Sequence, residues 1–261
     1  MSHFPVSVTI ITQNEEACIR QAIESVRWAD DIIVVDSGSK DQTVQIAKEM
    51  GARTFFNPWH GYGQQKNFAQ KQAKHDWVLN IDADETVSED LKNEILTRLE
   101  QVHTEDPAVR GFSVPRKTFY LGRWVQYGGW YPNYLVRLAN RNYADWTEPH
   151  VHEDLAVRGR VEKLLRPLNH DAFRTIEDQI HTNLRFARLG SEDLKRKGQR
   201  PSILKLIFKP IGKFFETYVL KMGFRDGLRG FIISVNAAHS MFLKHAFLHE
   251  VTLKNENLGH R

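Results

Sequence analysis

The stretch from Trp77 to Glu85, WVLNIDADE, is a short apolar run that ends in three carboxylates. It is too short for an ordinary helix, so it predicts a buried strand whose acidic side chains lie at its C-terminal end. In open α/β sheets, ligands bind beyond the carboxyl ends of the strands. Two Asp separated by one residue at such an end offer hard oxygen ligands to a divalent cation, which can also hold phosphate oxygens. For this stretch alone, a solvated acidic loop that caps the next helix is an equal alternative.

Apolar runs and helical patterns alternate in the chain before this stretch. Short, largely β-branched or apolar runs cover residues 6–12, 32–35 and 53–56. Helical patterns follow them, the first capped by Asn14 and running to Val26, the others at residues 41–50 and 64–73. This alternation predicts right-handed crossovers and a parallel sheet that is buried on both faces.

Polar clusters follow the predicted strands, each at a strand end or at the start of the next helix. They are Thr12–Glu15, Asp36–Gly38, Gln64–Asn67 and Asp82–Asp84. Singly, each is as easily a cap or a turn, but four at the same sheet edge predict one binding crevice. A carboxylate there accepts from a ribose hydroxyl or a base N–H, a lysine meets phosphate, and a metal bridges a diphosphate.

The bulk composition is that of an ordinary folded protein, with 41% apolar and 26% charged residues in 261. The single cysteine, Cys18, forms no internal disulfide and no cysteine zinc site, which indicates a reducing compartment. Neither a secretory signal nor an uncharged apolar run of spanning length is expected. No glycine-rich dinucleotide fingerprint follows the first strand, and no P-loop motif occurs.

Several motifs together resemble a known enzyme family. TIITQNEE, IIVVDSGSKDQT, NPWHGYGQQKN and WVLNIDADE, in this order, resemble the nucleotide-binding half of glycosyltransferase family 2, the inverting enzymes with a GT-A fold. FYLGRWVQYGGWYPNYLVRL, PHVHED and FFETYVLKMGFRDGLRGF are similar to the lipopolysaccharide inner-core glucosyltransferases of the WaaE/KdtX type. The resemblance covers nearly the whole chain. It implies an α/β GT-A nucleotide-diphospho-sugar transferase fold with a mainly parallel central sheet and C-terminal amphipathic helices.

The resemblance also implies roles for individual residues. Asp82 would contact the ribose, and Asp84 would hold the metal, Mg²⁺ or Mn²⁺. His170 would be an extra metal ligand, as in many GT-A relatives, although a loop histidine without a task is an equal alternative. Glu85 is expected to begin the next helix. The residues expected to line the uridine and the diphosphate are Thr12, Asn14, Glu15, Asp36 and Lys66.

A second acidic segment, HVHED at residues 150–154, is expected to carry the catalytic base. In a direct inverting displacement the acceptor hydroxyl loses a proton as it attacks the anomeric carbon, and a carboxylate suits that task. The resemblance places the family's base in this segment, which favours Glu153, with Asp154 second. Residues expected at the acceptor or sugar pocket are Trp130, Tyr131 and Arg137, the aromatic rings offering flat surfaces to sugar faces or simply packing a small domain.

The C-terminal part is strongly basic. Residues 195–229 hold ten Lys or Arg and two acidic residues, a net charge of +8, whereas the whole chain carries +4. Lys205, Lys209 and Lys213 lie on one helical face among bulky apolar residues, and Pro210 is expected to break or kink that helix. Basic and apolar surface together favour contact with an anionic membrane. The alternative is a helical pair that packs on the sheet with a solvated lysine face.

The predicted organisation has three parts. Residues 1–100 form the nucleotide-sugar-binding half, residues 101–174 the acceptor-binding and catalytic half of the same GT-A domain, and residues 175–261 a helical, membrane-associating extension. The predicted protein is a metal-dependent inverting glycosyltransferase, peripheral at the cytoplasmic face of the inner membrane. It moves a sugar, expected to be glucose, from a UDP-sugar to lipid A-core or another lipid-linked acceptor, and the resemblance points to a heptose of the lipopolysaccharide inner core.

Two alternatives remain beside this prediction. Related folds transfer sugars to polyprenyl phosphates next to membranes, although such enzymes usually have longer membrane segments. A non-catalytic, membrane-bound UDP-binding module is the alternative from another class, and the presence of both Asp82 and Asp84 together with Glu153 speaks against it. Nucleic acid is not an expected partner, because the lysines alternate with aliphatic residues more than with aromatic rings that stack on bases.

Overall fold

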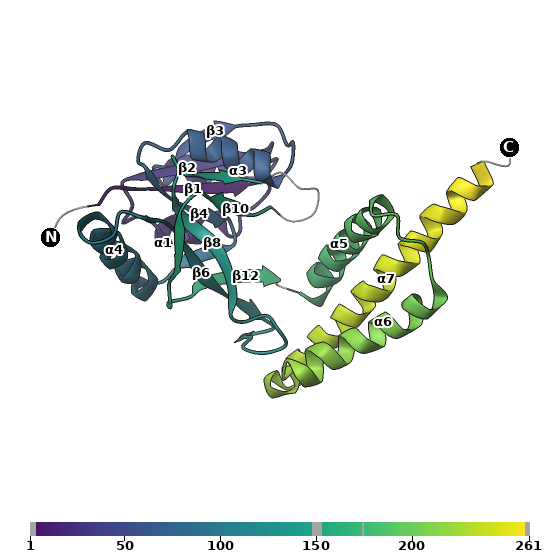
Figure 1. Ribbon diagram of the computed structural model, residues 1–261. Helices are drawn as coiled ribbons and strands as arrows, with labels where there is room; N and C mark the ends of the chain where they lie inside the picture. The colour runs from purple at the N-terminus through teal and green to yellow at the C-terminus, as the bar shows by residue number, and fades with distance from the viewer. Residues whose placement is uncertain (1–3, 148–152, 174, 259–261) are drawn as a thin grey trace. The chain divides into compact units, whose positions relative to one another are not determined.

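The computed structural model describes residues 4–147, 153–173 and 175–258, and the chain divides into two compact units (Figure 1). The first unit consists of Met1–Lys117 and Pro132–Asp171. The second consists of Thr118–Tyr131 and Ala172–Arg261. The chain therefore passes from one unit to the other at three places in the sequence.

The first half of unit 1 alternates strands and helices, as predicted. Its elements are β1 (Val6–Thr12), α1 (Ile19–Ser25), β2 (Asp31–Asp36), α2 (Thr43–Glu49), β3 (Arg53–Phe56), α3 (Tyr62–Lys71), β4 (Trp77–Asp82), β5 (Glu85–Val87) and α4 (Glu89–Thr104). Strand β1 is parallel to both β2 and β4, and β2 is parallel to β3. The predicted parallel sheet is confirmed for these four strands.

The chain after α4 extends the sheet with strands that pair antiparallel, apart from one. The elements are β6 (Val109–Tyr120), β7 (Arg123–Trp124), β8 (Asn133–Asn140), β9 (Ala144–Trp146), β10 (Leu155–Val157), β11 (Arg160–Lys163) and β12 (Leu168–Phe173). Strand β8 pairs antiparallel with β4, β6 pairs antiparallel with β8, and the sheet order is β3-β2-β1-β4-β8-β6-β12-β5. The exception is β11, which is parallel to β6. Strands β9 and β10 form a separate antiparallel pair.

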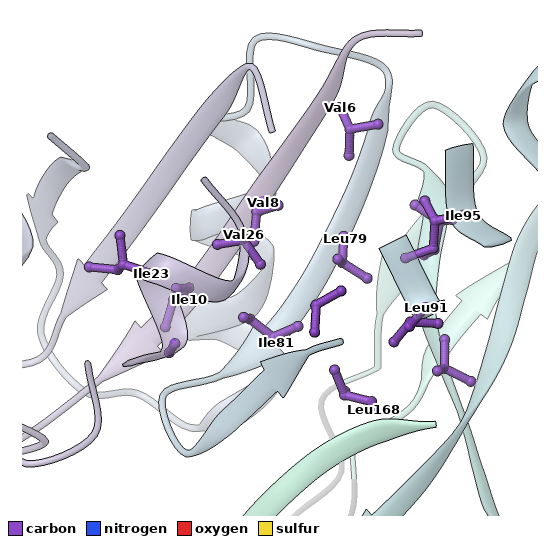
Figure 2. Close-up of a cluster of buried hydrophobic side chains, with 14 of the residues drawn as sticks. Val6, Val8, Ile10, Ile23, Val26, Leu79, Ile81, Leu91, Ile95 and Leu168 are labelled. Carbon is purple, nitrogen blue, oxygen red and sulfur yellow. The ribbon is translucent and has the colours of Figure 1, made fainter. Parts of the chain in front are cut away.

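The core of unit 1 lies on both faces of the parallel strands. All seven residues of β1 are buried, which explains why this run has no polar face. Val8 and Ile10 of β1 belong to the larger cluster, together with Ile23 of α1 and Leu91 of α4 (Figure 2). Ile11 belongs to a smaller cluster, which includes Ala69 of α3. The strand ends are therefore held by packing on two sides.

The predicted cap of the first helix is wrong. Helix α1 begins at Ile19, and Asn14 has a positive φ of 57° in the left-handed region that asparagine tolerates. Its side-chain oxygen accepts a hydrogen bond from the backbone N–H of Lys40, 2.8 Å away, instead of one from its own helix. Ser88 does cap α4 and accepts from the N–H of Leu91.

Unit 2 contains three long helices and a hairpin of strand segments. The helices are α5 (Ile176–Arg196), α6 (Ile203–Phe215) and α7 (Leu228–Leu258), with a π-helical segment η1 (Glu216–Leu220) and a 3₁₀ segment η2 (Gly223–Asp226) between the last two. Helices α5 and α6 both lie along α7 (Figure 1). In the described part of the chain, no helix has the length and apolarity needed to cross a membrane.

A buried hydrogen-bond network joins the hairpin of unit 2 to its helices. The hydroxyl of Tyr120 donates to Oε1 of Gln179 on α5, and Nδ2 of Asn236 on α7 donates to the same oxygen, each over 2.5 Å. The ring of Tyr120 is fully buried and lies with Val125 and Ile233 in one apolar cluster. Residues 118–131 are therefore part of the helical unit.

Helix α6 continues through Pro210, so of the predicted break or kink the break does not occur, and the kink stays a prediction. Proline removes one donor, which leaves the carbonyl of Leu206 without its helical N–H partner. No residue of α6 is buried, so water reaches this helix and can satisfy that carbonyl. Helix α5 begins at Ile176 and is capped by Thr175, whose side chain forms a capping box with Asp178.

Candidate active site

The carboxyl ends of three parallel strands meet at one edge of the sheet. Thr12 at the end of β1 is in register with Asp36 at the end of β2, and Ile11 is in register with Asp82 at the end of β4. The parallel register therefore brings Thr12, Asp36 and Asp82 to neighbouring positions. This edge is where open α/β sheets bind ligands.

Asp36 organises the turn that follows β2. Its Oδ2 accepts the N–H groups of Gly38 and Ser39 over 2.8 and 2.9 Å, and its Oδ1 accepts the hydroxyl of Ser39. The same hydroxyl oxygen accepts the backbone N–H of Asn14 over 2.8 Å. An ionised carboxylate has about four acceptor positions, so Asp36 retains acceptor capacity while it fixes the turn beside Asn14.

Thr12 and Glu15 lie in the first loop of this edge. The Thr12 hydroxyl is buried and has no hydrogen-bond partner among the described residues. The backbone N–H of Glu15 donates to the Thr43 hydroxyl over 2.8 Å, which ties this loop to the start of α2. Since buried polar groups are normally paired, the Thr12 hydroxyl is suited to a ligand that the protein alone does not supply.

Lys66 of α3 joins two carboxylates from distant parts of the chain. Only 5% of this residue is exposed, and its Nζ lies 3.2 Å from Oδ1 of Asp82 and 2.8 Å from Oε1 of Glu153. The ammonium also lies 4.5 Å from the ring centroid of Trp146. A buried cation needs such partners because its desolvation is costly.

Arg137 of β8 forms the second buried cationic contact. Its Nη2 donates to Oδ2 of Asp82 over 2.6 Å and to Oε1 of Glu85 over 2.7 Å, and only 3% of Arg137 is exposed. Burial alone would raise the pKa of Asp82, but the charges of Arg137 and Lys66 outweigh it and hold that pKa far below its ordinary value. These two cations therefore favour the ionised form of Asp82.

Glu85 is the residue of this site that the sequence-based prediction misplaced. It begins β5 rather than a helix, and it is completely buried. Its Oε2 accepts the backbone N–H of Asp82 over 3.0 Å, and its Oε1 lies 3.5 Å from Nη1 of Arg116. Glu85 and Val87 are buried on either side of Thr86, which is the period of two of a strand, but a glutamate at an inward position gives the sequence no apolar alternation that would indicate it. Glu85 braces the turn that carries the acidic pair.

Asp84 and His170 face each other beside this brace. The backbone N–H of Asp171 donates to the Asp84 carbonyl over 2.9 Å, and β12 pairs with β5 so that His170 is in register with Glu85. Oδ2 of Asp84 lies 3.3 Å from Nε2 of His170. This is close to the roughly 3 Å between neighbouring ligands of one octahedral cation.

The residues at this position fit a divalent cation that is shared with a ligand. No group of three or more His, Cys, Asp or Glu in the described ranges is arranged to hold a metal by itself. Asp84 and His170 would supply two ligand atoms, and phosphate oxygens commonly complete such sites for Mg²⁺ and related ions. The donor set thus matches a metal that arrives with, or is completed by, a diphosphate.

Two hydrogen bonds join Thr147 to Asp154, the residue after Glu153. The N–H of Asp154 donates to the Thr147 hydroxyl, and the N–H of Thr147 donates to the Asp154 carbonyl, each over 2.9 Å. Glu153 turns to Lys66, whereas Asp154 is exposed. Residues 150–152 of the predicted HVHED segment lie outside the described residues.

Trp130 and Tyr131 belong to unit 2. The Trp130 ring packs near those of Tyr120 and Phe173, with centroids 5.6 and 5.9 Å apart. Within this unit the Trp130 ring packs against the apolar core. Packing of a small domain was one of the two roles predicted for these aromatic residues. The role of both aromatic residues in a sugar pocket stays a prediction, as do the ligand contacts expected for Arg137.

Trp146 is a further residue of the site that the sequence analysis did not single out. It ends β9, and its backbone exchanges two hydrogen bonds with the side chain of Asn67 on α3, over 2.8 and 2.9 Å. This pairing holds the indole ring against the ammonium of Lys66. Asn67 lay in a predicted polar cluster, but nothing in the local pattern around Trp146 indicated the contact.

The family assignment follows from comparison with known proteins. The model of the family described as Glycosyl transferase family 2 matches residues 7–171. The chain belongs to glycosyltransferase family 2. The match covers the strand ends, the acidic pair and the loop of Glu153, so the site described above lies within the family domain.

Relatives and solved structures agree with this assignment. An uncharacterized glycosyltransferase of Rickettsia typhi is 33% identical over 97% of this chain and 89% of its own length. The lipopolysaccharide core biosynthesis glycosyltransferase LpsC of Rhizobium meliloti is 31% identical over 94% of this chain and 92% of its own. Glucosyl-3-phosphoglycerate synthase of Mycobacterium tuberculosis has a similar fold, with a TM-score of 0.50 and 20% identity over 76% of this chain and 82% of that chain. The predicted GT-A fold and the family resemblance are confirmed.

Proposed function

We propose that this family 2 glycosyltransferase moves glucose from UDP-glucose to a lipid-linked acceptor, with inversion at the anomeric carbon. The observation that carries this proposal is the cluster of Lys66, Asp82 and Glu153 at the carboxyl edge of the sheet. It combines a buried cation for phosphate, a carboxylate for ribose and a second carboxylate for proton transfer. A merely structural cluster would not need an incompletely buried acid such as Glu153, whose side chain is 18% exposed.

The donor half of the proposal rests on the strand-end residues. The unpaired hydroxyl of Thr12 and the ordered turn of Asp36 offer acceptors and donors to a uridine, with Asn14 and Glu15 in the adjoining loop. The solved mycobacterial synthase was crystallised with Mn²⁺, uridine diphosphate and its glucosylated product. This supports a uridine nucleotide as the donor carrier for the present chain.

Asp84 and His170 are the residues proposed to hold Mg²⁺ or Mn²⁺. Their ligand atoms converge within 3.3 Å, and a carboxylate with an imidazole suits Mn²⁺ at least as well as Mg²⁺. When bound, such an ion neutralises charge that develops on the leaving diphosphate. Lys66 supplies a further positive charge on the protein side, 3.2 Å from Asp82.

Glu153 is the proposed general base. The acceptor hydroxyl oxygen forms a bond to the anomeric carbon while the bond from that carbon to the diphosphate oxygen breaks, and UDP leaves with the electron pair. Glu153 accepts the hydroxyl proton, so the step yields the glucosylated acceptor, UDP and a protonated Glu153 that afterwards gives its proton to solvent. The contact with Lys66 keeps this carboxylate oriented before substrates bind.

The acceptor is proposed from the relatives. The Rhizobium protein is named for lipopolysaccharide core biosynthesis, which supports lipid A-core, with a heptose of the inner core as the sugar that receives glucose. Such an acceptor is membrane-bound, so the enzyme is proposed to act as a peripheral protein on the cytoplasmic face of the inner membrane. The basic residues between 195 and 229 support contact with anionic lipids.

The test is a donor screen with purified protein. The protein is incubated with UDP-, GDP-, ADP- and dTDP-sugars in the presence of Mn²⁺ or Mg²⁺, and released nucleotide is measured with and without extracted lipid A-core. The proposal expects UDP release with UDP-glucose, stimulated by the lipid acceptor. Release from none of the donors, together with no UDP binding by calorimetry, would refute it.

A further inference from the structure

Helix α6 presents apolar side chains to solvent along one side. At about 100° per residue, the six that are exposed fall on an arc of roughly 140°. Leu204 and Phe208 are 67% and 62% exposed, although such side chains are normally buried. The full set is Ile203, Leu204, Ile207, Phe208, Ile211 and Phe215. None of the residues of α6 is buried, so this helix leaves an apolar face without cover in unit 2.

The exposed apolar surface continues past the end of α6. Five more large apolar residues are exposed in the π-helical and 3₁₀ segments, in the turn between them and at the start of α7, namely Val219, Leu220, Met222, Phe224 and Leu228. Internal contacts do hold the segment together, since the Phe214 ring stacks on Tyr218 and meets Phe231 edge to face, at 5.3 and 5.9 Å. The exposed residues therefore belong to a packed helical hairpin, and monomeric proteins rarely expose so much contiguous apolar surface.

A groove with three lysines lies next to this face. It has a volume of about 510 Å³ and lies between α6 and α7, with Leu204, Phe208 and Met241 as apolar lining. Lys205, Lys209 and Lys213 line it at successive helical turns. The groove thus joins a row of ammonium groups to the edge of the apolar arc.

The two ends of the groove differ in charge. Lys213 lies 3.1 Å from the carboxylate of Glu216, which also pairs with Lys221 over 2.6 Å. At the other end, Lys205 contacts only the neutral amide of Gln199, over 3.4 Å, and Lys209 has no ion-pair partner in the described ranges. Positive charge that is not compensated by the protein therefore concentrates at Lys205 and Lys209.

We infer that the groove seats the phosphate of an anionic phospholipid headgroup between Lys205 and Lys209, with α6 lying in the plane of the membrane. In this arrangement the apolar arc of α6 enters the upper acyl region, and the lysines extend to the headgroups beside it. This deepens the proposed function by naming the surface that brings the enzyme to its lipid-linked acceptor.

A second copy of the chain fits this face less well than a membrane. In a twofold interface the same patch meets itself, so the lysine rows of both copies would lie at one interface. Like charges at an interface are unfavourable, whereas phosphates complement the row at Lys205 and Lys209. The charge pattern therefore favours the anionic lipid surface.

The experiment measures binding of the full-length protein to vesicles by co-sedimentation. Vesicles contain phosphatidylcholine alone or phosphatidylcholine with phosphatidylglycerol. Lys205→Gln/Lys209→Gln removes the uncompensated charges, and Leu204→Ser/Phe208→Ser removes apolar area from the arc. The matched control is Lys48→Gln/Lys71→Gln, which removes two exposed lysines from unit 1. Circular dichroism checks that each variant folds.

We expect the wild-type protein and the control to bind the anionic vesicles and to bind the neutral ones much more weakly. Because each lysine near an anionic surface contributes roughly fivefold in partitioning, the double lysine variant should bind about 25-fold more weakly. The apolar variant should also lose binding. Equal binding to both vesicle types, or a lysine variant that binds like the control, would overturn the inference.

Two further measurements separate this inference from its rivals. Sedimentation velocity that shows a wild-type dimer, split by Leu204→Ser/Phe208→Ser while vesicle binding is unchanged, would assign the face to a second copy and overturn the inference. UDP release in solution tests the proposed function without membranes, so vesicle binding with neither donor turnover nor UDP binding would refute only the proposed function. Donor turnover without vesicle binding would refute only the inference.

Discussion

The ammonium of Lys66 lies 2.8 Å from the carboxylate of Glu153 and so joins two residues that are 87 positions apart. The same ammonium lies 3.2 Å from Asp82. One buried cation therefore links the proposed base to the proposed ribose-binding carboxylate. Because both contacts originate from a residue of the donor edge, the orientation of the base depends on the residue that is expected to meet the donor phosphate.

Replacing Lys66 by Met should lower kcat strongly. The variant keeps the length of the side chain but releases Glu153, and a misplacement of about 1 Å at a reacting group costs on the order of 100-fold. Steady-state kinetics with UDP-glucose measure the effect, and Lys66→Arg should restore part of kcat because it restores the charge. Lys71→Met, an exposed position on the same helix, is the control. Equal kinetics in the two Met variants would contradict the role of Lys66.

Replacing Glu153 by Gln should abolish transfer but preserve donor binding. The amide retains the shape of the side chain and cannot accept a proton, and loss of general base catalysis costs about 10²–10⁴-fold. Transfer is measured by product formation, and UDP binding by calorimetry. Asp154→Asn is the matched variant, since Asp154 is the neighbouring exposed carboxylate. Loss of transfer in Asp154→Asn but not in Glu153→Gln would move the base to Asp154.

Replacing Asp84 by Asn should weaken the metal-dependent part of UDP binding. Even outer-shell partners of a metal contribute 10–100-fold to its affinity, so we expect a loss of at least about tenfold in the presence of Mn²⁺. Calorimetry with and without Mn²⁺ gives the metal-dependent part, and a chelator should bring the wild-type protein to the level of the variant. His170→Ala should act in the same direction. Asp76→Asn removes an exposed carboxylate and should change nothing.

Replacing Glu85 by Ala should destabilise unit 1. Glu85 is completely buried and pairs with Arg137, which is 3% exposed and would keep Asp82 as its one remaining carboxylate partner among the described residues. Breaking such a pair costs about 3–5 kcal/mol of the free energy of unfolding. Urea denaturation measures the change. Glu89→Ala removes an exposed partner of Lys92 and serves as the control, so equal destabilisation by both would contradict the brace.

Acid should destabilise unit 2 through His245. Burial lowers the pKa of His245, and the charges of Lys244, Lys205, Lys209 and His249 act in the same direction. As the pH falls, the unfolded chain therefore takes up a proton at His245 at a higher pH than the folded chain does. The free energy of unfolding falls as the pH drops through about 6.5 toward the lower folded pKa. Urea midpoints at about pH 8 and pH 5.5 should differ more for the wild-type protein than for His245→Gln. An equal difference would contradict this contribution.

Much of the donor half could be predicted from the sequence because its signals are local. Strand β1 is buried along its whole length, so its apolar run was visible without any tertiary information. The parallel register then brings Thr12 and Asp36 together, which follows from topology alone. The same holds for Thr175, whose capping box lies within four residues.

The contacts that complete the site could not be predicted in this way. Glu85 was predicted to begin a helix. The local sequence does not reveal its partner Arg137, which lies 52 residues away. The pairing of Lys66 with Glu153 crosses 87 residues, and only the folded chain shows it. Asparagine is a common helix cap, but the hydrogen bond that the Asn14 side chain accepts from the N–H of Lys40 outweighs that propensity. Sequence patterns report propensity, whereas these contacts depend on long-range pairing.

The helical unit is not a tail that can be cut off. Its hairpin, Thr118–Tyr131, is inserted between two strands of the sheet, and it shares a core with Ile233 of α7. A chain truncated after residue 174 would keep the hairpin and lose the helices that cover Tyr120 and Val125. A soluble catalytic fragment would therefore need a second excision that rejoins Lys117 to Pro132. Evolution faces the same constraint, because the helices cannot be exchanged as a module unless the inserted hairpin changes with them.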